Sequence, residues 1–209
     1  MSEKKSGFGG MLKLGVILAL YSTIACVGLA FIYAGTEQVI EQRRQTDQEA
    51  ALKELFPDAD SFKPITVKSP DPAVIIEEGD AFAAMKNGKA VGAALTASRA
   101  GYSGTGKPIV TMVGVDASGK INGVKILDAS GETPGLGANA ASPNYYVDRS
   151  RGIRFYDQFA GKNAADPFVP KQDVIIITAA TITSRAVAAS VKAAGVAAMA
   201  WLGSQGGSR

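Results

Sequence analysis

The chain has 209 residues, a length that predicts one main domain plus whatever the termini add. Its 22 Lys and Arg against 19 Asp and Glu give a formal net charge of +3, and it contains no histidine and a single cysteine, Cys26. This composition excludes a Ser-His-Asp triad, an imidazole base, an internal disulfide, and any metal site built from His or Cys of this chain alone. Redox chemistry would therefore need a bound organic cofactor or a partner subunit.

An apolar run of 23 residues without a charge, residues 14–36, lies between Lys13 and Glu37. As a helix it spans about 34 Å, enough to cross the hydrocarbon core of a bilayer. The alternatives are a buried core helix and a cleaved signal peptide, but the run is longer than the apolar stretch of a signal peptide. We therefore predict a single uncleaved transmembrane helix over residues 14–36.

The charges that flank this run predict its orientation. Three lysines and one acid precede it, and two acids followed by two arginines come after it: Lys4, Lys5, Lys13 and Glu3, then Glu37, Glu41, Arg43 and Arg44. The positive-inside bias predicts that residues 1–13 lie in the cytoplasm and that the domain lies on the extracytoplasmic side of the membrane. Without the three lysines and one acid of the first flank, the rest of the chain has 19 basic and 18 acidic residues. A nucleic-acid-binding surface needs an excess of basic residues, so we expect no nucleic-acid partner.

A juxtamembrane helix and linker are predicted over residues 37–72. Residues 37–56 are rich in Glu, Gln, Arg and Ala and end at Pro57, which is typical of a helix and its stop signal. Residues 61–72 hold three prolines and predict a loop. Short strands are expected next, over residues 73–77 and 90–96.

Two runs rich in Val and Ile, residues 109–115 and 121–127, are joined by five turn residues. This pattern predicts a β-hairpin. A loop is expected over residues 129–151, followed by an aromatic segment of helical spacing at residues 155–159.

The last part of the chain predicts one more strand and one more helix. Residues 174–178 form a continuous β-branched run, and residues 183–202 form an Ala-rich stretch with few charges. We therefore expect residues 73–209 to form one α+β domain, with an antiparallel sheet and flanking helices, on a single N-terminal transmembrane helix.

Residues 101–107 (GYSGTGK) match the first seven positions of a phosphate-binding P-loop. Pro108 stands where a Ser or Thr should reach Mg²⁺, and a strand follows instead of the required helix. We interpret the segment as a flexible, glycine-rich connection to the hairpin.

Two further segments suggest a binding site. Residues 131–137 (GETPGLG) combine a carboxylate, a stiffening proline and glycines that let backbone amides approach a ligand, although the pattern also fits an ordered loop. Residues 178–185 (TAATITSR) place four hydroxyls where the predicted strand turns into the predicted helix. Helix capping would account for one or two of these hydroxyls. The alternative is that an anion, such as a phosphate, lies over the exposed amides at the start of the helix.

The ETPGLG run and, about forty residues later, the TAATITS run together resemble the FMN-binding domain shared by the G subunits of Rnf electron-transport complexes and the C subunits of sodium-pumping NADH:quinone reductases. The resemblance implies that a dedicated flavin transferase attaches FMN through a phosphoester to Thr181. It also implies that eleven other residues of the two runs line the cofactor site: Glu132, Thr133, Pro134, Gly135, Leu136, Gly137, Thr178, Ala179, Ala180, Thr183 and Ser184.

Two positions depart from the usual family pattern. The family usually has Gly where this chain has Ala179, and Asp where it has Ile175, whereas Asp173 is near that position but out of register. An alanine is tolerated unless the backbone there needs a positive φ.

The length of the chain favours the Rnf G subunit within this family. The resemblance then implies an electron relay in a ferredoxin:NAD oxidoreductase complex that moves Na⁺ or H⁺, between a membrane iron–sulfur centre of the A and E subunits and the flavin-bearing D subunit. The alternatives are the quinone-reductase C subunit and a membrane-tethered assembly module with a degenerate flavin site. No catalytic residue and no metal site are expected.

Overall fold

The computed structural model describes residues 8–104 and 106–206, in two units that meet between Asp47 and Gln48. Of the predicted cytoplasmic segment, residues 1–7 lie outside the described residues. Each unit is described by itself.

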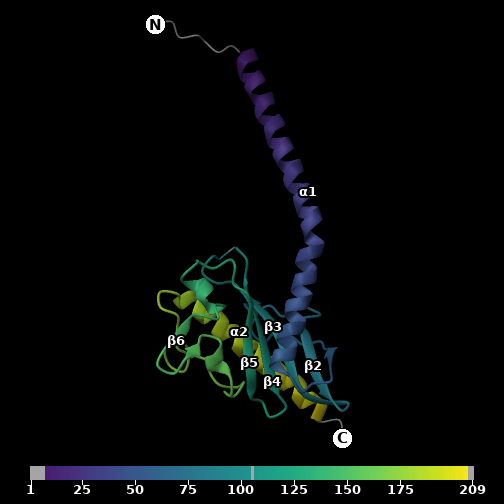
Figure 1. Ribbon diagram of the computed structural model, residues 1–209, viewed down its shortest axis with the longest axis vertical. Helices are drawn as coiled ribbons and strands as arrows, with labels where there is room; N and C mark the ends of the chain where they lie inside the picture. The colour runs from purple at the N-terminus through teal and green to yellow at the C-terminus, as the bar shows by residue number, and fades with distance from the viewer. Residues whose placement is uncertain (1–7, 105, 207–209) are drawn as a thin grey trace. The chain divides into compact units, whose positions relative to one another are not determined.

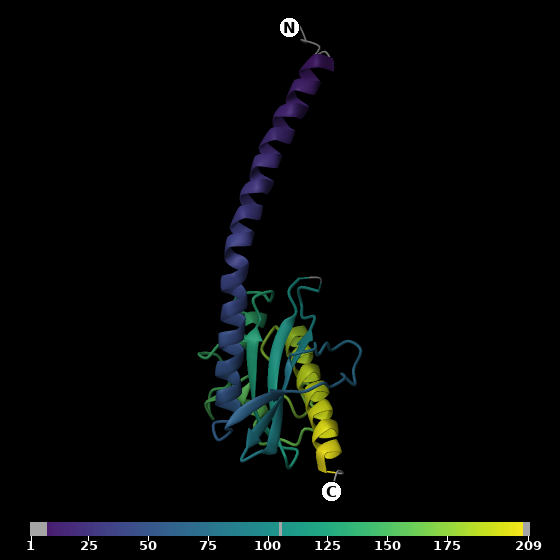
Figure 2. The same cartoon turned by 90° about the vertical axis from the view of Figure 1, so that its right-hand side faces the viewer.

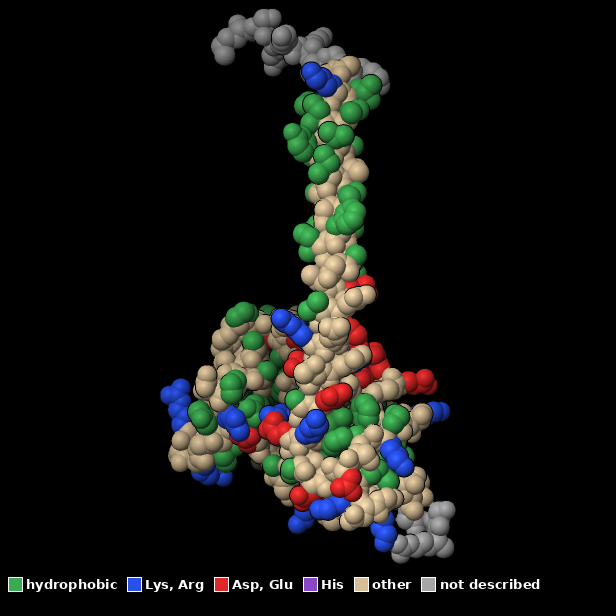
Figure 3. Space-filling view, turned by 45° about the vertical axis from the view of Figure 1, so that its right-hand side comes forward, with side chains coloured by type: hydrophobic (Ala, Val, Ile, Leu, Met, Phe, Trp, Pro, Cys, Tyr) green, Lys and Arg blue, Asp and Glu red, His purple; other side chains and the backbone are tan. Residues whose placement is uncertain are grey.

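The first unit is formed by α1, which runs without a break over Phe8–Leu55 and passes into the second unit at its C-terminal end (Figure 1). Over residues 9–47 its apolar side chains are exposed, and the most apolar 18-residue window has no buried residue; Figure 3 shows the apolar side chains on the face in view. A helix that is apolar on every side in this way fits a membrane span. The predicted helices at residues 14–36 and 37–56 are thus one element, which ends just before Phe56 and Pro57.

The second unit is built on an antiparallel sheet of five strands that pair in chain order. The strands are β1 (Ser61–Pro64), β2 (Ala81–Lys86), β3 (Lys89–Arg99), β4 (Ile109–Asp116) and β5 (Ile121–Asp128). Figure 2 shows α2, which spans Thr181–Gly206, running along one face of this sheet. This α+β architecture confirms the expected fold class.

The two faces of the sheet bury different side chains. The α2 face includes Leu95, Val113 and Val115 and is closed by apolar residues of α2. The other face packs against Leu52 and Phe56, at the C-terminal end of α1. Although α2 is also long and apolar enough to cross a membrane, 56% of its most apolar window is buried, so it is the core helix of this domain.

The predicted hairpin is confirmed by the pairing of β4 with β5, and the predicted strand at residues 90–96 lies within β3. The sequence interpretation missed β2 and its turn to β3, where Asn87 and Gly88 have φ values of 51° and 76°. Positive φ at both central positions is the geometry that favours Asn-Gly turns between antiparallel strands.

Two strand predictions and part of one loop prediction are wrong. Residues 61–64 form the edge strand β1, where Pro64 is tolerated because an edge needs fewer N–H donors. Residues 73–77 are not a strand, because only Ile75 pairs with the sheet, through a bridge to Ser98. Residues 174–178 are not a strand either, because within them only Val174 makes a bridge, to Pro170.

The connection between β5 and α2 holds four short elements: two lie in the predicted loop at residues 129–151, one lies just after that loop, and one lies in the predicted segment of helical spacing at residues 155–159. They are the 3₁₀ helices η1 (Gly137–Ala140) and η2 (Asp157–Phe159) and the paired strands β6 (Tyr146–Asp148) and β7 (Ile153–Arg154). The segment of helical spacing at residues 155–159 therefore holds one 3₁₀ turn. The predicted C-terminal helix is confirmed and is longer at both ends.

Candidate functional site

A cleft of about 450 Å³ lies where three separate segments of the domain meet. It is lined by Tyr102 from the loop after β3, by Glu132, Thr133, Leu136 and Gly137 from the loop after β5, and by Ala179, Ala180, Thr181, Ile182 and Thr183 at the start of α2. The structure thus brings together the two sequence motifs. Four residues of the predicted set do not line this cleft: Pro134, Gly135, Thr178 and Ser184.

The carboxylate of Glu132 joins the three segments. Its Oε1 accepts the backbone N–H of Tyr102 at 3.0 Å, and its Oε2 accepts the hydroxyl of Thr183. Glu132 is only 3% exposed, so each oxygen needs such a donor to offset the loss of water. A single side chain therefore fixes the loop after β3 and the loop after β5 to the first turn of α2.

Glycines on either side make room for this carboxylate. A Cβ added to Gly101 would lie 2.1 Å from Glu132 Oε1, and one added to Gly137 would lie 2.5 Å from Glu132 Oε2 and 2.6 Å from Thr183 Oγ. Neither position has space for a side chain without moving the carboxylate. The glycines of the two loops are thus explained in part by close packing around Glu132.

The loop after β5 is ordered by its own backbone. The N–H groups of Leu136 and Ala138 both donate to the carbonyl of Thr133, at 3.1 and 3.2 Å. The Asn139 side chain donates to the carbonyl of Gly135 at 2.7 Å. These bonds turn Leu136 and Gly137 toward the cleft and leave Pro134 and Gly135 on its outside.

The four hydroxyls near the start of α2 have different environments. Ser184 Oγ is buried, donates to the carbonyl of Ala180 at 2.9 Å and accepts the N–H of Ile177 at 3.0 Å. Thr183 is buried against Glu132, whereas Thr178 is exposed and lies outside the cleft. The capping interpretation is therefore wrong for Thr183 and Ser184, because their hydroxyls bond to other groups.

Thr181 is the first residue of α2 and is half-buried at the cleft. Within the described part of the chain its hydroxyl makes no hydrogen bond. The carbonyl of Ala180 accepts the first helical bond, from Ser184 N–H at 3.0 Å, so the N–H groups of the three residues before Ser184 have no partner within the helix. A free hydroxyl and free amides thus lie together, an arrangement that suits a phosphate group.

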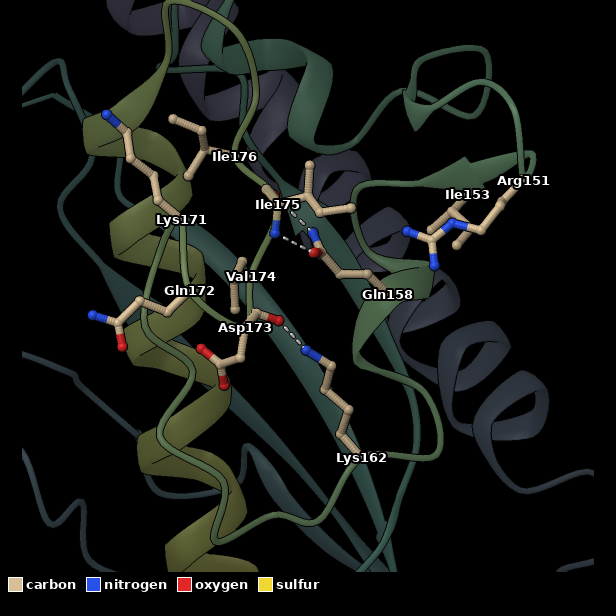
Figure 4. Close-up of a pocket in the computed structure, with 10 residues that line it drawn as sticks. All are labelled: Arg151, Ile153, Gln158, Lys162, Lys171, Gln172, Asp173, Val174, Ile175 and Ile176. Carbon is tan, nitrogen blue, oxygen red and sulfur yellow. Dashed lines mark hydrogen bonds between the residues drawn. The ribbon is translucent and has the colours of Figure 1, made fainter.

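The segment before α2 is held by side chains from the η2 region, as Figure 4 shows. The Gln158 side chain accepts the N–H of Ile175 at 2.7 Å and donates to the Ile175 carbonyl at 3.0 Å. Lys162 donates to the carbonyl of Asp173. A side-chain amide therefore replaces the neighbouring strand that residues 174–178 lack.

These residues border a second cleft, of about 480 Å³, that also includes Arg151. Arg151 pairs with Asp148 at 2.6 Å, and hydrogen bonds from the Ser150 hydroxyl and from Arg151 lower the pKa of Asp148 to about 2. Because Arg151 and Lys162 both have partners within the protein, this cleft mainly fixes the chain that leads to Thr181. We assign the candidate site to the first cleft.

Asp173 does not take the place of the family's usual carboxylate. Its two oxygens accept the backbone N–H groups of Phe168 and Val169, which closes the turn at residues 168–173. The position in register with the family motif is Ile175, whose side chain is 38% exposed. The carboxylate that the family usually has at this position is absent.

Comparison with known proteins places this geometry in a family. A family model of the FMN-binding domain matches residues 101–195, and a model of the RnfG N-terminal region matches residues 2–55. The chain is 31% identical over 196 residues to the G subunit of the Na⁺-translocating ferredoxin:NAD⁺ oxidoreductase complex of Acetobacterium woodii, covering 86% of this chain and 87% of the relative. The chain belongs to the G subunits of ion-translocating oxidoreductase complexes.

Other G subunits agree over similar lengths. The chain is 32% identical to the G subunit of the proton-translocating ferredoxin:NAD⁺ oxidoreductase complex of Clostridium ljungdahlii, over 82% of this chain and 85% of the relative. It is 33% identical to the G subunit of the ion-translocating oxidoreductase complex of Shewanella baltica, over 87% and 86%. The resemblance drawn from the two motifs is thus confirmed, and the long apolar α1 is consistent with a single anchor in a membrane complex.

The cleft of this protein fits an FMN-binding domain. Its volume is within the usual range for small-molecule sites, about 300–1,000 Å³. Its lining includes three exposed apolar side chains, Tyr102, Leu136 and Ile182, together with the free hydroxyl and amides at Thr181. An apolar ring system with a phosphate on a polar tail matches this combination.

Sequence interpretation missed Tyr102, because residues 101–107 were interpreted only as a connection to the hairpin. Tyr102 reaches the cleft because its N–H is held by Glu132, 30 residues further along the chain. An aromatic residue inside a glycine-rich loop was the available signal. The sequence alone did not indicate which other loop it would meet.

The Ala179 backbone has φ of +59°, the left-handed conformation that alanine disfavours. The glycine that the family usually has there would adopt it without strain. We expect Ala179→Gly to raise the free energy of unfolding by about 1 kcal/mol, and the melting temperature by about 2–4 °C for a domain of this size. Thermal denaturation of the full-length protein in detergent measures this change.

The matched control is Ala180→Gly. Ala180 has no positive φ and is buried, so glycine there loses a packed methyl group and gains chain entropy in the unfolded state. It should therefore lower the melting temperature. Equal shifts of the same sign in both variants would contradict the role assigned to the Ala179 backbone.

Proposed function

We propose that this chain carries FMN covalently, through a phosphoester to the hydroxyl of Thr181, and relays electrons within a ferredoxin:NAD⁺ oxidoreductase complex that moves Na⁺ or H⁺. The observation that carries the proposal is the Thr181 hydroxyl, which has no hydrogen bond to any described residue and lines the cleft at the first turn of α2 in an FMN-binding domain. The related G subunits of such complexes in Acetobacterium woodii and Clostridium ljungdahlii support the reaction class.

Different residues of the cleft hold different parts of the cofactor. The backbone N–H groups of the first turn of α2, beginning at Thr181, bind the phosphate and stabilise its negative charge. Leu136 and Ile182 keep water from the ring system, and Glu132 keeps both loops in place against α2. FMN, when bound, supplies the electron-accepting and electron-donating chemistry that the side chains of this chain lack.

The partners follow from this role. We infer that electrons arrive from the membrane iron–sulfur centre of the A and E subunits and leave to the flavin-bearing D subunit, and that a flavin transferase attaches the cofactor. The exposed apolar surface of α1 supports an anchor in the cytoplasmic membrane. Purification of the native complex would distinguish an Rnf assembly from a quinone reductase, because the accompanying subunits differ.

Covalent attachment is tested by co-expressing the full-length protein with a flavin transferase. Intact-mass analysis should show the added mass of one FMN less one water, and flavin fluorescence should remain with the protein band in a denaturing gel. A protein that carries no flavin under these conditions would favour an assembly module with a degenerate site.

Orientation is the second part of the proposal. We propose that residues 1–13 lie in the cytoplasm and residues 73–209 outside it, because lysines dominate the flank that precedes the apolar run. Protease added outside sealed spheroplasts should digest the domain that follows α1. The domain should be protected in inside-out vesicles, and the opposite pattern would reverse the assignment.

A further inference from the structure

Tyr102 is an exposed aromatic side chain to which the proposed function gives no role so far. It lines the cleft and is 68% exposed, and Leu136 and Ile182 beside the cleft are 40% and 50% exposed. Each of these three side chains comes from a different one of the three segments. A group of exposed apolar side chains around a cleft is typical of a surface that a ligand covers.

The backbone of Tyr102 is fixed although its side chain is free. Its N–H donates to Glu132 at 3.0 Å, and the preceding Gly101 packs so closely that an added Cβ would lie 2.8 Å from Ile109 Cδ1 as well as 2.1 Å from Glu132. Within the described residues, the Tyr102 ring has no aromatic or cationic neighbour in contact, and its hydroxyl has no hydrogen bond. The loop therefore presents an anchored aromatic ring to the cleft without using it in the fold.

We propose that Tyr102 packs against the isoalloxazine ring of the FMN carried by Thr181 and shields that ring from water. The inference rests on the proposed function and adds a cofactor contact from the glycine-rich loop at residues 101–107. Aromatic rings in offset or edge contact gain attraction beyond the burial of their area. Glu132 acts as the positioning residue, because it binds the Tyr102 backbone and the Thr183 hydroxyl at once.

Flavin fluorescence in the native protein reports this contact. A phenol in contact with a flavin gives an electron to the excited ring and takes it back without emission of light, so a neighbouring tyrosine shortens the fluorescence lifetime. Phenylalanine keeps the packing but is much harder to oxidise. Tyr102→Phe should therefore lengthen the native lifetime severalfold while leaving the ring shielded, and Tyr102→Ala should lengthen it and also increase quenching by added iodide.

The experiment uses full-length protein co-expressed with a flavin transferase and purified in detergent, and Tyr146→Phe is the matched control. Tyr146 is 42% exposed on β6 and does not line the cleft, so its substitution should leave the lifetime unchanged. Fluorescence of each variant in a denaturing gel gives the amount of attached flavin independently of any native contact, and confirms that the measured lifetimes come from covalently bound FMN.

The outcomes separate this inference from the proposed function. If the variants carry FMN but both Tyr102 variants keep the wild-type lifetime, the contact is wrong and attachment stands. If Tyr146→Phe lengthens the lifetime as much as Tyr102→Phe does, the quenching is not specific to Tyr102 and the contact is again wrong. If the wild-type protein carries no FMN, the proposed function fails and the contact fails with it.

Discussion

Thr181→Ala, co-expressed with the flavin transferase, should lose the covalent FMN completely. A phosphoester needs one hydroxyl oxygen that can reach the phosphate, and the Thr181 hydroxyl lines the cleft with no hydrogen bond to any described residue. Alanine removes that oxygen but preserves the helix, because it is the best helix former. Intact mass should fall by the added FMN, and the fluorescent band in a denaturing gel should disappear.

Three other variants test whether Thr181 is the residue to which FMN is attached. Thr181→Ser keeps a hydroxyl at the same position and should keep the adduct. Thr178→Ala should also keep it, because Thr178 lies outside the cleft. Thr183→Ala should keep it at a cost of about 1–3 kcal/mol in stability, since it removes a buried donor from the Glu132 carboxylate. An adduct that persists in Thr181→Ala would move the attachment to another residue.

The elements that the sequence predicted well depend on local signals. The β4 and β5 hairpin follows from two Val and Ile runs and a short turn, and α2 follows from a long Ala-rich stretch. Residues 174–178 have the same β-branched composition as a strand but have no neighbouring strand on which to pair. Gln158 supplies the missing partner at Ile175, and nothing in the local sequence indicates that contact.

The same difference between local signals and long-range contacts applies to the candidate site. Thr181 and the ETPGLG loop could be predicted, because each is a contiguous motif. The meeting of Glu132 with Tyr102 and Thr183 could not, because it joins residues 30 and 51 positions away through one buried carboxylate. The effect of Ala179 on stability likewise depends on its backbone φ angle, which the sequence does not specify.

Gly137→Ala tests whether the Glu132 carboxylate is the structural centre of the site. The added methyl would lie 2.5 Å from Glu132 Oε2, 2.6 Å from Thr183 Oγ and 3.0 Å from Glu132 Cβ. Glu132 must then move away from Thr183, which combines an overpacked core with a weakened hydrogen bond to a charged group. We expect the free energy of unfolding to fall by about 3 kcal/mol and the melting temperature by about 10 °C.

Gly135→Ala, two residues earlier in the same loop, separates this packing effect from backbone strain. Gly135 has φ of +75° with open space around it, so alanine there is strained but meets no atom. Its expected loss is about 1 kcal/mol, and because Gly135 does not line the cleft, flavin attachment should persist. In Gly137→Ala the displaced carboxylate also releases the Tyr102 loop, so the native flavin lifetime should lengthen as well as the stability fall. Equal losses of stability in the two variants, with an unchanged lifetime in Gly137→Ala, would mean that Glu132 does not hold the site together.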